Sequence, residues 1–256
     1  MTCKGAAAFN AVTHRIGSAE EGERVMPKRS DAQGDRVTPP SRASGTTRPV
    51  TDALRRQVRE ELPEIGLISD PQLQEKIVEA WAFALAGSSF KSIREIPPAG
   101  NPGTNEAVRG DQTDHLRGVT RIALQVADEF TARYPELEID RDTVIAGALV
   151  HDVGKAWEFD PVNRKRWKTS QKRYGKPSIR HPAYGAHICL TVGLPEEIAH
   201  IAMGHSGEGE LLVRSLENTI VHHADYTFWY VLLAGGMIKP ETVREKDLRY
   251  VQDKGY

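Results

Sequence analysis

The stretch Ala148-Leu149-Val150-His151-Asp152-Val153-Gly154-Lys155 ends an apolar run abruptly in an imidazole and a carboxylate. Burying both groups without partners would cost several kcal/mol. A metal ion would compensate for this cost, because it binds histidine nitrogen and carboxylate oxygen together. Four more side chains that can ligate a metal lie within the same span of about 110 residues: His115, His181, His205 and Asp225. The sequence therefore predicts a metal centre.

The apolar residues around this pair recur at helical spacing. A helix is predicted from about Gln112 to Tyr134, and His115 stands four residues before Val119, on the same inward face. That face is formed by Leu116, Val119, Ile122, Ala123, Val126 and Phe130. A second helix is predicted from Asp140, which can cap it, to Gly154, a natural stop. Residues 144–150 are apolar nearly all round, which indicates a central, buried helix.

Further helices are predicted on both sides of this region. Asp70-Pro71 is typical of a helix start, and a turn-rich linker at 96–103 ends the N-terminal helical unit. The inward face of that first helix is formed by Ile77, Ala80, Trp81, Ala84 and Leu85. After a polar loop, helices are predicted to start at His181 and at Leu194. A long helix from about Glu210 to Leu233 would bury Val213, Leu216, Ile220, Val221, Ala224 and Phe228, with Asp225 near that face.

The chain is predicted to comprise four segments. Residues 1–50 have few large apolar side chains and are predicted to be a disordered tail, with Met26 as an alternative start. The acids Glu20, Glu21, Glu23 and Asp31 argue against a transit peptide. Residues 51–110 are predicted as an N-terminal helical extension and linker, 111–235 as the metal-binding domain, and 236–256 as a C-terminal helical segment.

The bulk composition favours a globular enzyme of the cytoplasm. The 256 residues are 39% hydrophobic and 27% charged, with no apolar run of the roughly 18 residues that span a bilayer. The two cysteines, Cys3 and Cys189, lie far apart, which is typical of a reducing compartment. A net charge of −1 argues against general nucleic-acid binding. No membrane partner is expected, and a homo-oligomer is left open.

The order of His115, His151-Asp152 and Asp225 resembles the HD-domain metal-dependent phosphohydrolase superfamily. The text His151-Asp152-Val153-Gly154-Lys155 is close to the HDIGK form of that family, and residues 220–225 resemble its closing segment. The resemblance covers roughly residues 110–232. It implies an all-α fold, an HD-domain helical bundle, here with an N-terminal helical extension.

The resemblance extends to the subclass with two metal ions. His181 and His205 resemble the two histidines that this subclass adds, and Asp152 would then bridge two ions. His115, His151 and Asp225 would hold one ion, and His181 and His205 the other. The Gly-Tyr-Pro signature of cyclic-dinucleotide hydrolases is absent from the sequence, which disfavours such substrates. Three other histidines compete for ligand roles: His187, His222 and His223.

A shell of nitrogen and oxygen ligands without cysteine suits one or two divalent transition metal ions, Fe, Mn, Co, Ni or Zn. Such ions generate a nucleophile from water and clamp phosphoryl oxygens. Lys155 would then be a catalytic residue beside Asp152, available to a substrate oxyanion or to that aspartate. The competing interpretation of Lys155 is a cation favoured at a helix C-terminus.

A basic segment connects His151-Asp152 to His181. Between Asp160 and Arg180 the chain carries eight cations against one acid. A cationic flap over the site would attract a small anionic substrate, although such runs are also typical of solvated surface loops. Trp167 and Tyr174 are interleaved and could stack on a ring. The predicted substrate-binding residues are Arg164, Lys165, Arg166, Lys168, Lys172 and Arg173.

Three functions remain open from the sequence. The first is a metal-dependent phosphohydrolase that cleaves a small phosphorylated metabolite or nucleotide with a metal-activated water. The second, implied by the same resemblance, is a mixed-valent di-iron oxygenase that cleaves a C–C or C–P bond. The third is a regulatory module that keeps the metal without catalysis. The complete ligand set and the charged segment favour an enzyme over a regulatory module. The hydrolase and the oxygenase need the same ligands, and the prevalence of hydrolases in the resembled family, together with a cationic flap that suits a phosphate ester, favours the hydrolase.

Overall fold

The computed structural model describes residues 48–251. Met26 and nearly all of the predicted tail at 1–50 therefore lie outside the described residues. The chain there is helical, with a single two-stranded antiparallel sheet, and the all-α prediction is confirmed. The α-helices are α1 (Asp52–Glu61), α2 (Pro71–Ala86), α3 (Gln112–Arg133), α4 (Arg141–Val150), α5 (Lys155–Glu158), α6 (Pro161–Thr169), α7 (Gln171–Tyr174), α8 (His181–Thr191), α9 (Glu196–Gly204) and α10 (Leu216–Ala234). The strands are β1 (Ala99–Asn101) and β2 (Thr104–Glu106). Short 3₁₀ turns lie at η1 (Pro63–Leu67), η2 (Ile93–Glu95), η3 (Pro135–Leu137), η4 (Gly207–Leu211), η5 (Pro240–Thr242) and η6 (Glu245–Tyr250).

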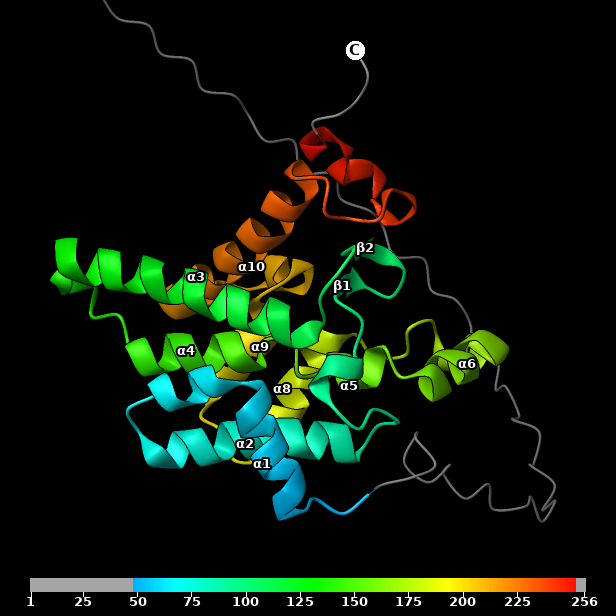
Figure 1. The fold of residues 1–256 in the computed structure, drawn as a ribbon, viewed down its shortest axis with the longest axis horizontal. Coiled ribbons are helices and arrows are strands. Elements are labelled where there is room, and N and C mark those ends of the chain that lie inside the picture. Colours follow the sequence, from blue (N-terminus) through cyan, green and yellow to red (C-terminus); the bar gives the residue numbers. More distant parts are fainter. Residues whose placement is uncertain (1–47, 252–256) are drawn as a thin grey trace, which may run out of the picture. The chain divides into compact units, whose positions relative to one another are not determined.

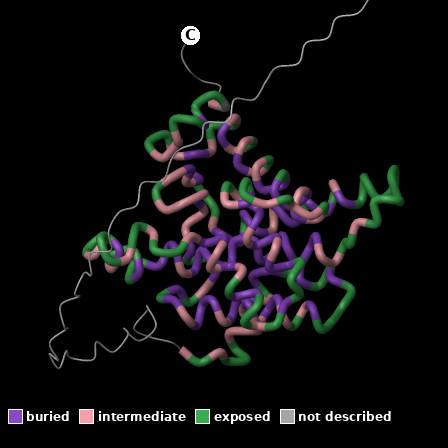
Figure 2. Tube along the Cα trace, turned by 180° about the vertical axis from the view of Figure 1, so that it is seen from behind, coloured by how far each residue is buried: buried purple, intermediate pink, exposed green. Residues whose placement is uncertain are grey.

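Helix α4 is the centre of this arrangement. Every residue from Val144 to Val150 is buried, as the apolar pattern predicts. The helix packs against α2, α3, α9 and α10, and Figure 1 shows α3 running alongside it with α2 on its other side. The Asp140 side chain accepts a hydrogen bond from the backbone N–H of Thr143, so the predicted cap is confirmed. Figure 2 shows the buried stretches of chain gathered in the interior of the helices.

The N-terminal helices α1 and α2 share a hydrophobic core with α4 and α8. The Trp81 indole donates a hydrogen bond of 2.8 Å to the Leu149 carbonyl oxygen, which ties α2 to the turn before His151. Asp70 caps α2 through the backbone N–H of Gln72, as its sequence predicts. The domain boundary near residue 110 stays a prediction, because these helices contribute to the same core as α4.

Several details of the predicted helices are wrong. The linker at 96–103 contains β1 and leads into β2, and the following residue Ala107 pairs with Ile238. The last long helix starts at Leu216 instead of Glu210, and both Val213 and Leu216 are exposed instead of buried. Phe130 is also exposed, because α3 extends beyond the helices that cover its first turns. The polar loop after Asp160 contains two helices, α6 and α7.

Helix α4 ends at Val150, four residues before the predicted stop at Gly154. Gly154 has an ordinary helical φ of −68°, so it does not act as a left-handed cap. A Cβ built there would lie 2.0 Å from the carbonyl oxygen of His181 and 2.7 Å from the backbone nitrogen of Gly185. The glycine is therefore required by the close approach of α8, which positions His181 beside Asp152.

Gly154→Ala should lower the free energy of unfolding by about 3 kcal/mol, the upper end of the range for overpacked interiors, because backbone atoms must move. Denaturant unfolding with a chelator present measures this effect without a metal contribution. Gly66→Ala is the matched control, since a Cβ there meets nothing within 4 Å, and it should change stability by less than about 0.5 kcal/mol. Equal stability of the two variants would contradict the packing explanation.

Candidate metal centre

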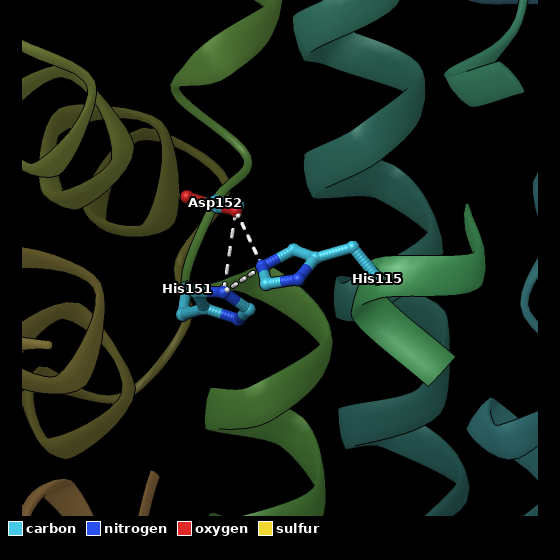
Figure 3. A group of neighbouring side chains, drawn as sticks. All are labelled: His115, His151 and Asp152. Atoms are coloured by element: carbon cyan, nitrogen blue, oxygen red, sulfur yellow. Dashed lines mark hydrogen bonds and ion pairs between the residues drawn. The ribbon is translucent and has the colours of Figure 1, made fainter. Parts of the chain in front are cut away.

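The six predicted ligands come together in the structure, and each is buried. His115 lies in the first turn of α3, and His151 directly follows α4, with Asp152 in the next turn. His181 is the first residue of α8 and His205 directly follows α9. Asp225 lies in the middle of α10. Five helices thus deliver these side chains to one place, and Figure 3 shows His115, His151 and Asp152 pointing toward one another.

The two carboxylate oxygens of Asp152 face different pairs of histidines. Oδ2 lies 3.1 Å from Nε2 of His115 and 3.3 Å from Nε2 of His151. Oδ1 lies 3.4 Å from Nε2 of His181 and 3.5 Å from Nε2 of His205. Metal bonds of about 2.0–2.2 Å place neighbouring ligand atoms about 3.0–3.5 Å apart. The separations around Asp152 are therefore those of ligand atoms that could share a metal ion.

Asp225 completes the side that contains His115 and His151. Its Oδ1 lies 3.3 Å from Nε2 of His115 and 3.9 Å from Nε2 of His151. This oxygen is buried and forms no hydrogen bond with any described residue. Burial alone would raise the pKa of Asp225, but the neighbouring His115 and His151 lower it to about 2. Asp225 is therefore an anionic oxygen donor whose partner is missing among the protein atoms described.

The tautomers of three histidines follow from their hydrogen bonds. Nδ1 of His151 lies 2.7 Å from the Ala148 carbonyl oxygen, and Nδ1 of His205 lies 2.9 Å from that of Ala202. Carbonyl oxygens only accept, so each Nδ1 carries the proton and each Nε2 presents a lone pair. The Nε2 atoms of His115 and His151 are 3.2 Å apart. The Nε2 lone pair of His151 and the carboxylate oxygens of Asp152 and Asp225 converge here with Nε2 of His115, and this donor set fits a divalent metal ion.

Glu158 orients the third of these histidines. The buried carboxylate accepts hydrogen bonds from the backbone N–H of His181 at 2.8 Å and from its Nδ1 at 2.6 Å. Arg180 donates to the other oxygen at 2.5 Å. Burial would raise the pKa of Glu158, but His181 and Arg180 lower it, so the carboxylate is ionised. A carboxylate that holds a histidine in this way fixes its tautomer and increases its affinity for a metal.

Two further side chains hold Asp152 itself. Lys155 Nζ lies 2.6 Å from Oδ2 of Asp152 and donates a second hydrogen bond to the Ala99 carbonyl oxygen of β1. The buried amide of Gln112 donates to the same Oδ2 at 2.9 Å. Burial alone would raise the pKa of Asp152, but the charge of Lys155 keeps it well below its usual range. Asp152 is therefore held ionised and in one orientation.

The competing histidines take other places. The His222 Nδ1 donates a hydrogen bond of 2.6 Å to the His205 carbonyl oxygen, so His222 supports the end of α9. His187 and His223 are exposed on α8 and α10. Among the described residues, the groups that could hold a metal ion are formed by the six predicted ligands: His115, His151, Asp152, His181, His205 and Asp225.

A cavity of about 390 Å³ opens onto this cluster, and we call it the metal cavity. Asp152, His181, His205 and Asp225 line it, together with the cation Lys155. Its outer walls come from the hairpin, from α10 and from the C-terminal segment, with Asn101, Asn105, Arg180, Glu208, Tyr226, Trp229, Tyr230, Arg244 and Lys246 among the lining residues. Glu158, Gln112 and these wall residues were not predicted. Gln112 carried a sequence signal, because it precedes His115 by about one helical turn, and Arg180 belongs to the basic segment that leads to His181.

The basic segment divides into two groups. Arg164, Lys165 and Lys168 of α6 line a second cavity of about 700 Å³. The Arg166 guanidinium instead lies over the rings of Trp157 and Tyr174, and Lys172 and Arg173 line neither cavity. Trp167 is buried at 2% exposure and is among the residues that line the second cavity, whereas Tyr174 lines neither cavity. A stacking role for Trp167 stays a prediction.

Glu158→Gln should weaken metal binding about 10- to 100-fold, because His181 loses the carboxylate that holds it. Isothermal titration of the chelator-treated protein with Mn²⁺ or Co²⁺ measures this change. Glu64→Gln is the matched control: Glu64 is equally buried, but it pairs with Arg117 and Arg121 away from the cluster. That variant should keep wild-type metal affinity whatever its stability. Unchanged metal affinity of Glu158→Gln would show that Glu158 has no part in the centre.

Comparison with known proteins finds similarity over part of the chain. A dihydroneopterin 2',3'-cyclic phosphate phosphodiesterase from Methanocaldococcus jannaschii is 29% identical over 164 residues, which is 62% of this chain. The chain spans 63% of the length of that relative. No solved structure gives a significant match. Residues 113–229, which include the whole cluster from His115 to Asp225, match the family described as the HD domain. The candidate metal ligands therefore all lie within the segment that matches this family.

Proposed function

We propose that the protein is a metal-dependent phosphohydrolase that cleaves a small phosphodiester. One observation carries this proposal: the two carboxylate oxygens of Asp152 face two separate pairs of histidines. This arrangement suits a pair of ions bridged by one carboxylate. His115, His151 and Asp225 would hold one ion, and His181 and His205 the other. The phosphodiesterase name of the relative supports the same reaction class.

When bound, divalent ions at this place would supply Lewis acidity and a water made nucleophilic near neutral pH. Side chains of the protein would bind and orient the substrate beside these ions. Lys155 and Arg180 line the metal cavity and would neutralise the nonbridging phosphoryl oxygens of the substrate. Water would add to phosphorus, one P–O bond would break, and the leaving oxygen would take a proton. Lys155 also fixes Asp152, so we assign it both a positioning and a substrate-binding role.

The substrate class follows from the cavity and from the relative. A volume of about 390 Å³ suits a molecule of nucleotide size. The walls combine cations with Tyr226, Trp229 and Tyr230, which favours an anionic substrate with a planar ring. The relative is named for a 2',3'-cyclic phosphate, in which the phosphorus is part of a strained diester. We therefore propose a cyclic phosphodiester as the substrate class.

The first test is metal content. The purified protein should carry one to two divalent transition metal ions per chain, measured by elemental analysis after anaerobic purification. Asp152→Ala should lose the most metal, because both groups of histidines face this residue. His187→Ala is the control, since His187 is exposed on α8, and it should keep its metal. The proposal fails if the wild type and Asp152→Ala are equally free of metal.

The second test is the reaction itself. Adenosine 2',3'-cyclic phosphate should be opened to the monoester under anaerobic conditions with Mn²⁺ or Co²⁺, as followed by phosphorus NMR. Dioxygen should have no effect on the rate, since hydrolysis needs a Lewis acid and water. An oxygenase built on the same ligands would instead demand iron and consume dioxygen. Turnover that occurs only with iron and dioxygen would replace the hydrolase assignment by the oxygenase.

A further inference from the structure

The second cavity lies beside the metal cavity, and we call it the α6 cavity. One wall is formed by Arg164, Lys165 and Lys168 of α6, with Lys176 beyond them. Asn101 and Pro102, in the turn of the hairpin, also line it. Its volume of about 700 Å³ exceeds that of the metal cavity. A molecule of nucleotide size therefore has room to extend beyond the cluster of metal ligands.

The charge of the α6 cavity is almost entirely positive. Within residues 48–251 no carboxylate forms an ion pair with the side chains of Arg164, Lys165, Lys168 or Lys176. The single acid in the wall, Glu158, is already bound to Arg180 and His181. Like charges collected in a cleft focus the electrostatic field and attract counter-ions. A cavity with four unpaired cations therefore favours an anion with more than one charge.

The two cavities adjoin through shared residues. Asn101 and Arg180 line both of them. The Arg180 guanidinium is fixed between two carboxylates, with 2.5 Å to Glu158 and 2.8 Å to Glu208. The same Glu158 holds His181 of the candidate metal centre. A ligand that passes Arg180 would therefore reach from the metal cavity into the α6 cavity.

We propose that the α6 cavity binds a second phosphate group of the substrate, remote from the phosphodiester that is cleaved. This inference rests on the proposed function. A phosphate monoester carries a charge of about −1.5 to −2 at pH 7, which matches several unpaired cations better than a carboxylate does. The substrate class is then a cyclic phosphodiester that carries an additional phosphate monoester. The assignment keeps Arg164, Lys165 and Lys168 as substrate-binding residues and removes Arg166, Lys172 and Arg173 from that role.

The test compares adenosine 2',3'-cyclic phosphate with its 5'-phosphorylated form. These probes differ by one phosphate monoester, placed across the ribose from the cyclic diester. The wild type should have a KM about tenfold lower for the 5'-phosphorylated form, and this preference should shrink as salt is raised. In the double variant Lys165→Glu, Lys168→Glu the preference should disappear. The KM for the unphosphorylated probe is the internal reference in each protein.

The chain offers a matched control, Lys172→Glu with Arg173→Glu. This double variant has the same change of charge in the same segment, but its residues line neither cavity. It should keep the preference within about twofold. Equal KM values of the two probes in the wild type would overturn the inference. So would a preference that survives in Lys165→Glu, Lys168→Glu, or one that both double variants lose equally.

Calorimetric binding of both probes separates this inference from the proposed function. If neither probe is hydrolysed, tighter binding of the 5'-phosphorylated form by the wild type, lost in Lys165→Glu, Lys168→Glu, still supports the α6 cavity. If the cyclic diester is hydrolysed and the two probes bind equally, the phosphohydrolase stands and the second phosphate site is wrong. Circular dichroism and metal content should be equal in all three proteins, so that a difference in binding reports on the cavity.

Discussion

The Asp152 carboxylate is buried at 2% exposure, and its burial is the main energetic constraint in this structure. An ionised group in the interior costs several kcal/mol unless it is paired and hydrogen-bonded. Lys155 and Gln112 bind the Asp152 carboxylate, and four imidazoles from α3, α4, α8 and α9 or from the turns beside them surround it as candidate ligands of a shared cation. The ends of these helices must converge for the carboxylate to remain inside. The packing of the bundle and the candidate metal centre are therefore consequences of the same constraint.

Much of the bundle could be predicted, because its signals are local. The apolar run of α4 and the capping residues Asp70 and Asp140 lie within or directly beside the helices that they define, so the sequence alone locates these helices. The position of His115 follows from its spacing to Val119 on the buried face of α3. The same holds for Asp225 and Val221 on α10. A lone buried histidine is more often a core residue, so the predicted ligand roles of His181 and His205 depended on the resemblance of their segments to the HD-domain superfamily.

The remaining features depend on contacts between distant residues. Each strand of the hairpin has three residues, too few for an alternating pattern, and the chain after it pairs with Met237 and Ile238. Val213 has an apolar side chain at a helical position, yet the turn before α10 leaves it exposed. Glu158 supports His181 because α5 and α8 pack together, and no spacing in the sequence shows this. Packing also decides which cations of the basic segment line a cavity. The Arg166 guanidinium, for example, lies over the rings of Trp157 and Tyr174 instead.

The hairpin and the C-terminal segment lie outside residues 113–229 and are joined to each other. Asn105 donates to Asp247, and Lys239 donates its backbone N–H to the Glu106 carbonyl oxygen. Together these flanks supply Asn101, Arg244 and Lys246 to the cavity whose floor holds the candidate ligands. A substitution in either flank can therefore reshape the outer wall of this cavity without replacing any of the candidate metal ligands.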